Sequence, residues 1–122
     1  MDRIFFTIGA LSAGLSVAAG AFGAHGLKGK ISVEMLTVFE TGARYQMYHA
    51  FALLAVAWAL TRWQTSLFTT AGWLFTAGTL LFSGSLYLLA LSGVKWLGAI
   101  TPLGGLAFLA GWLCAAAGVW RS

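Results

Sequence analysis

The stretch FETGARYQMYHA, residues 39–50, gathers residue types that could do chemistry in a chain that has few of them. Asp, Glu, Lys and Arg together make up 8% of the 122 residues. Glu40 and Arg44 could form an ion pair or a proton site, and Tyr45 and His49 could contact a ligand. With His25, in the preceding GAHGL segment, they make a candidate polar cluster: His25, Glu40, Arg44, Tyr45 and His49.

Known catalytic and cofactor sites do not fit these residues. Two histidines and one glutamate supply three metal ligands without the close spacing of zinc sites, and haem would need both histidines at a similar depth. The only aspartate is Asp2, so no Ser-His-Asp set exists, and Cys114 has no charged neighbour to activate it. We therefore expect no catalytic residue, no metal and no cofactor, and a protein that is not an enzyme.

The elements that must position these residues are those of a membrane protein. Hydrophobic residues make up 60% of the chain, and residues 4–24, 63–94 and 96–120 carry no charge. Each of these runs exceeds or reaches the roughly 20 residues that a membrane-spanning helix needs. Residues 45–61 are a shorter fourth candidate, in which His49 is the only histidine or charged residue. The seven basic residues are scattered and form no patch, so nucleic acid is not an expected partner.

The pattern predicts an all-α integral membrane four-helix bundle in a single domain, residues 1–122. We expect helices at residues 4–24, 32–61, 67–91 and 97–120, the last of them regular from Pro102 onward or kinked there. Residues 4–24 have one bulky face and one face of small residues. Because small residues let helix backbones approach closely in lipid, we expect the small face to be buried against a neighbour.

The third helix carries hydroxyl groups along one side. Thr76, Thr79, Ser83 and Tyr87 fall within about 60° of one direction on a helical wheel. This candidate inward hydroxyl stripe can serve helix packing through hydrogen bonds. Alternatively, it can line a polar path through the membrane.

Within a membrane the polar cluster has three interpretations. Glu40 and Arg44 are one turn apart in the stabilising acid-before-base order, which favours an ion pair at the interface or against the glycine-rich loop. Tyr45 and His49 lie on another side of the same helix. A ligand or proton site is the alternative, since charges inside membranes are costly and often functional. It would need residues from other helices or another subunit.

Four motifs resemble one known family. The segments GAFGAHGL, FETGARYQMYHA, LFSGSLYLLAL and ITPLGG with FLAGW, in this order, are similar to the domain-of-unknown-function 423 family. This family consists of small four-helix membrane proteins and includes bacterial inner-membrane members and the eukaryotic transmembrane protein 256. The resemblance implies the bundle fold, a bacterial plasma membrane location and termini in the cytoplasm. It implies no particular reaction.

These observations support three hypotheses of function. The first is an integral membrane protein that acts by helix association, as a homo-oligomer or as an accessory subunit of a membrane complex. The second is a small oligomeric transporter or channel with a polar path. The third is a protein that binds lipid or quinone between its helices. In each case the lipid bilayer is the first partner.

Overall fold

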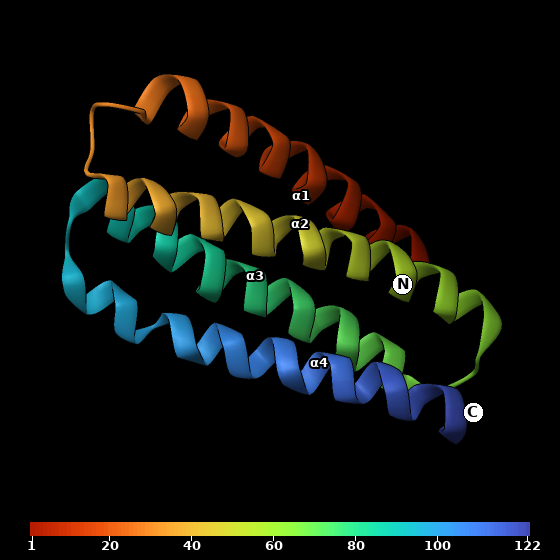
Figure 1. Ribbon diagram of the computed structural model, residues 1–122. Coiled ribbons are helices and arrows are strands. Elements are labelled where there is room, and N and C mark those ends of the chain that lie inside the picture. Colours follow the sequence, from red (N-terminus) through yellow and green to blue (C-terminus); the bar gives the residue numbers. More distant parts are fainter.

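The computed structural model describes residues 1–122 and is entirely helical apart from short connections. The four-helix count and the all-α class agree with the sequence prediction. Four long helices run antiparallel, and both termini lie at the same end of the bundle (Figure 1). Their bounds are α1 Asp2–Phe22, α2 Val33–Arg62, α3 Ser66–Ser92 and α4 Thr101–Arg121, with a π-helical turn at Gly23–Leu27 and a 3₁₀ helix at Lys95–Ala99.

The helix ends follow local chemistry. The Ser32 hydroxyl caps α2 by accepting from the backbone N–H of Met35 (3.1 Å), and Thr65 caps α3 in the same way through Leu67 (3.3 Å). Helix α3 ends at Gly93, whose φ of +73° lies in the left-handed region that glycine adopts at little cost. Capping and glycine therefore define the two ends of α3.

The segment that precedes α4 is a separate 3₁₀ helix. The α-helix begins at Thr101, with Pro102 in its first turn, as the sequence suggested for a helix that is regular only from this proline. The Thr101 hydroxyl does not cap the helix, although threonine before proline is typical of a cap. It forms a hydrogen bond with the Ser85 hydroxyl of α3 instead (2.6 Å), which holds the start of α4 against its neighbour.

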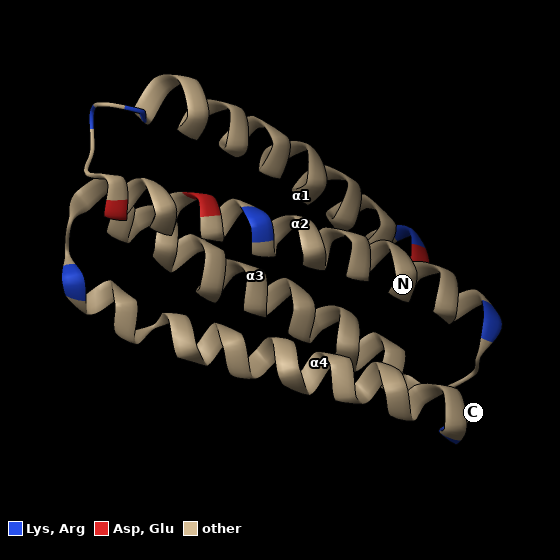
Figure 2. Cartoon of the chain, viewed as in Figure 1, with Lys and Arg blue, Asp and Glu red and all other residues tan.

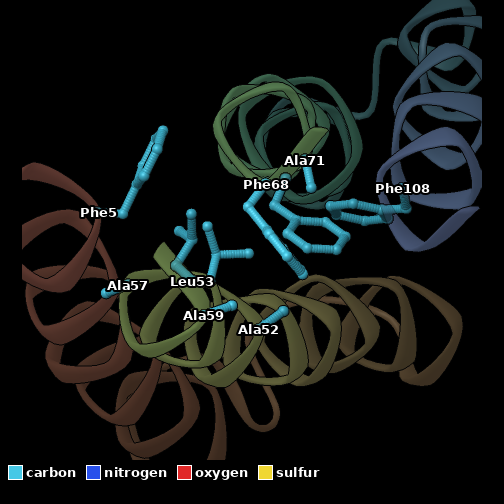
Figure 3. Close-up of a cluster of buried hydrophobic side chains, with 10 residues drawn as sticks. Phe5, Ala52, Leu53, Ala57, Ala59, Phe68, Ala71 and Phe108 are labelled. Atoms are coloured by element: carbon cyan, nitrogen blue, oxygen red, sulfur yellow. The ribbon is translucent and has the colours of Figure 1, made fainter. Parts of the chain in front are cut away.

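The helices pack in sequence order. Helix α1 lies on α2, α2 on α3 and α3 on α4, so α1 and α4 occupy opposite flanks of a central α2–α3 pair (Figures 1 and 3). Glycines allow the close approaches: a Cβ at Gly9 would lie 2.9 Å from the Ala50 carbonyl oxygen, and one at Gly104 would overlap the backbone of Phe82. The small face of α1 is buried at Gly9 and Ser16, and Gly23 in the following π-helical turn is buried as well. Gly20 on the same face has open space around it, so the expected burial holds for part of the face.

Phenylalanines fill the spaces that these small residues leave. Phe5 from α1, Phe68 from α3 and Phe108 from α4 lie in one buried cluster with an alanine-rich face of α2 (Figure 3), and Phe75 from α3 belongs to the same cluster. Phe5 and Phe75 are fully buried. Large rings against glycine and alanine give dense packing, which is the main source of helix association where lipid replaces water.

Most charged residues lie toward the two ends of the bundle, whereas Glu40 and Arg44 lie farther along α2 (Figure 2). Three helical segments are long and apolar enough to cross a membrane: Asp2–Leu27, Ser66–Ser92 and Lys95–Arg121. Helix α2 does not meet this criterion, because Tyr45, Gln46, Tyr48 and His49 lower its hydropathy. It is also the helix with the most buried residues.

Candidate functional site

The structure separates the five residues of the polar cluster. His25 is exposed in the π-helical turn, and Glu40 and Arg44 are exposed on the outer side of α2. The expected Glu40–Arg44 ion pair does not form; the one ion pair joins the Met1 amino group to Asp2 (3.9 Å). Exposed pairs gain little energy and cost side-chain entropy, which explains why the spacing alone does not bring them together. Tyr45 and His49 remain in contact.

His49 is buried and uses both ring nitrogens. Its Nδ1 lies 2.8 Å from the Tyr45 carbonyl oxygen, and its Nε2 lies 3.1 Å from the indole Nε1 of Trp112 in α4. A carbonyl only accepts and an indole N–H only donates, so this geometry assigns the neutral ring with the proton on Nδ1. The ring also stacks on Phe108, with centroids 3.5 Å apart. His49 therefore joins α2 to α4, and its nitrogens are not free for a metal.

The hydroxyl stripe on α3 faces α2 and α1. Thr76 and Thr79 donate to carbonyl oxygens of their own helix (2.8 and 2.9 Å). Ser83 donates to the Gly42 carbonyl of α2 (2.7 Å), and the Tyr87 hydroxyl donates to Oε1 of Gln46 (2.6 Å). The hydroxyls of Thr76 and Thr79 thus bond within α3, whereas those of Ser83 and Tyr87 join α3 to α2.

Gln46 is the residue that the sequence reasoning missed. It is 7% exposed, and besides accepting from Tyr87 it donates from Nε2 to the Ser12 carbonyl oxygen of α1 (2.9 Å). One turn away, the Ser16 hydroxyl donates to the Ala43 carbonyl (2.6 Å). The available signal was an uncharged amide inside an apolar helix, where an unpaired polar group is expensive. Helix α2 is thus hydrogen-bonded to α1, α3 and α4.

A groove of about 380 Å³ opens between α1 and α3 with α2 as its floor. This α1/α3 groove contains all four residues of the hydroxyl stripe, which therefore line a surface groove. No Asp, Glu, Lys or Arg lines it. Its polar residues are Ser12, Gln46, Thr76, Thr79, Ser83 and Tyr87.

A second groove, of about 530 Å³, lies between α2 and α4. Tyr45, His49 and Trp112 line it together with Gly105. No group of three or more His, Cys, Asp or Glu side chains that could hold a metal ion is present. The two grooves flank the central helix pair, one on the α1 side and one on the α4 side.

Comparison with known proteins gives a consistent result. A family model described as "Protein of unknown function (DUF423)" matches residues 19–105. UPF0382 membrane protein YwdK of Bacillus subtilis is 51% identical over 91% of both chains. UPF0382 membrane protein SSP2132 of Staphylococcus saprophyticus is 45% identical over 98% of both chains. No solved structure matches the chain.

Proposed function

The chain belongs to the DUF423 family, and on this premise we propose that it spans a membrane with all four helices and acts by associating with a second copy of itself. The observation that carries the proposal is the outer face of α1. Ala10, Gly14 and Ala18 are exposed there at four-residue spacing, and no atom would lie within 4 Å of a Cβ at Gly14.

Membrane placement of α2 is supported by its hydrogen bonds. Its polar residues Gln46 and His49 are buried and bonded to neighbouring helices, so they do not face lipid. Counting about 20 residues from Arg62 reaches the region of Gly42. Arg44 is then near the boundary of the hydrocarbon, where an exposed guanidinium can extend to the headgroups. This placement supports an interfacial role for Arg44 and Glu40.

On the outer face of α1 this stripe of small residues runs between bulky exposed residues, Leu11 and Leu15 on one side and Val17 on the other. The outer face of α4 presents bulky residues, among them Leu109 and Leu113, which are 63% and 72% exposed. A stripe with small residues every fourth position lets two helices cross closely and gain packing and backbone contacts, whereas bulky residues are solvated by lipid chains. A two-fold axis through Gly14 would place the same stripe on both copies.

Gly14→Leu is expected to dissociate the assembly. A leucine on the stripe would hold the two backbones apart, while the bundle itself has open space at this position. Native mass spectrometry from mild detergent should show a dimer for the wild type and a monomer for the variant. Gly105→Leu, at an equally open glycine on α4, should remain dimeric. A wild type that is monomeric, or dimers in both variants, would remove α1 as the interface.

A further inference from the structure

The α1/α3 groove has two hydrogen-bond donors that the protein does not use. The Ser12 hydroxyl makes no hydrogen bond, although the other four hydroxyl groups of the groove each do. Gln46 is more than nine-tenths buried and uses one of the two N–H bonds of its amide. Because unpaired donors are costly in hydrocarbon, both favour an acceptor that comes from outside the chain.

Apart from these hydroxyl and amide groups, the groove is apolar, and it carries no charge. Ile8, Leu11 and Leu15 of α1 face Leu80 of α3, and Leu53 of α2 lies at the floor. The absence of charged lining residues excludes phosphate and carboxylate headgroups, whose burial without a partner would be prohibitive. The volume, about 380 Å³, lies in the range of small-molecule sites. The ligand must therefore be neutral and largely hydrocarbon.

The depth of these two donors in the membrane narrows the class of ligand further. Ser12 is the middle residue of α1, ten residues from either end, or about 15 Å along the helix axis. The glycerol esters of bilayer lipids lie at the edge of the hydrocarbon region and would not reach this depth. A head that carries carbonyl oxygens and is itself soluble in hydrocarbon would reach it.

We propose that the α1/α3 groove binds an isoprenoid quinone, with a ring carbonyl accepting from Ser12 and Gln46 and the prenyl chain along the leucines of α1 and α3. The proposal concerns binding alone and assigns no electron transfer. It shares with the proposed function the membrane placement of the bundle, but it does not depend on association, because the groove is formed within one copy.

The test uses the full chain in phosphatidylcholine nanodiscs with a photoreactive azidoquinone that carries a prenyl chain. Labelled peptides should come from residues 8–15 and 76–87, and excess ubiquinone-2 should suppress the labelling. Gly84→Leu fills open space in the groove and should reduce labelling about tenfold or more. Ser12→Ala should reduce it about fivefold, as expected for one hydrogen bond.

Gly105→Leu is the matched control, since it fills open space in the other groove. It should label as the wild type does. Labelling that spreads equally over all lipid-facing helices, or that survives in Gly84→Leu, would overturn the proposal. Circular dichroism shows whether each variant is folded, and because Ser12→Ala removes no bond within the protein, it remains a test if Gly84→Leu does not fold. Gly14→Leu should retain labelling even when it is monomeric, which separates this site from the association interface.

Discussion

Gly104→Ala is expected to destabilise the bundle by about 2–3 kcal/mol, whereas Gly105→Ala, one residue further on, should leave stability unchanged or raise it by up to about 1 kcal/mol. A Cβ at Gly104 would overlap the backbone nitrogen and Cα of Phe82, so α3 and α4 would have to separate. Backbone atoms cannot move aside as the end of a flexible side chain can. At Gly105 a Cβ would have no neighbour within 4 Å.

Gly104→Ala and Gly105→Ala can be compared directly because the two positions are adjacent in one helix. Both glycines lie in the first turns of α4, so the gain in helix propensity on replacement by alanine is similar for both. The difference between the variants therefore measures the contact with Phe82. Reversible unfolding in mixed detergent micelles gives the free energies. Equal stabilities for the two variants would mean that α3 and α4 do not meet at this point.

Gln46→Leu is expected to cost about 1–2 kcal/mol, the scale of one or two interhelical hydrogen bonds in a membrane protein. The change removes the bonds to Ser12 and Tyr87 and leaves the Tyr87 hydroxyl without its acceptor. Tyr87→Phe should cost less, because it removes a donor and leaves the bond from Gln46 to Ser12 in place. The double variant should be more stable than the sum of the two costs predicts.

Thr79→Val is the control for the hydroxyl stripe. The Thr79 hydroxyl donates to the Phe75 carbonyl of its own helix, so its loss breaks no contact between helices. We expect a change of a few tenths of a kcal/mol, measured by the same unfolding assay. Strictly additive costs for Gln46→Leu and Tyr87→Phe would show that these two side chains are not coupled.

Helix number and packing faces could be predicted because they depend on local patterns. Uncharged runs, the Ser32 cap and Pro102 mark where helices lie, and the small residues of α1 mark the face that packs. Periodicity shows which residues share a face, but it does not show what covers that face. The outer stripe at Gly14 therefore could be identified only from the structure, in which α2 covers the opposite face of α1.

The polar network could not be predicted from spacing along one helix. Gln46 gains its role from Ser12 and Tyr87, which lie 34 and 41 residues away in the chain. His49 gains its second partner from Trp112, 63 residues away. Hydropathy counts these residues as unfavourable for a membrane helix, although tertiary hydrogen bonds satisfy them. Spacing also suggested an ion pair between Glu40 and Arg44. Both side chains are exposed, and an exposed ion pair gains too little energy to hold them together.

The most direct test of association through α1 is disulfide crosslinking in native membranes. The native thiol, Cys114, is first replaced by alanine, and Gly14→Cys or Leu109→Cys is then introduced. A two-fold crossing at Gly14 would bring the two new cysteines within the roughly 7 Å between Cα atoms that a disulfide requires. We predict that mild oxidation links Gly14→Cys into a dimer and leaves Leu109→Cys monomeric. A dimer that forms through Leu109→Cys, or no crosslink through Gly14→Cys, would contradict association through α1.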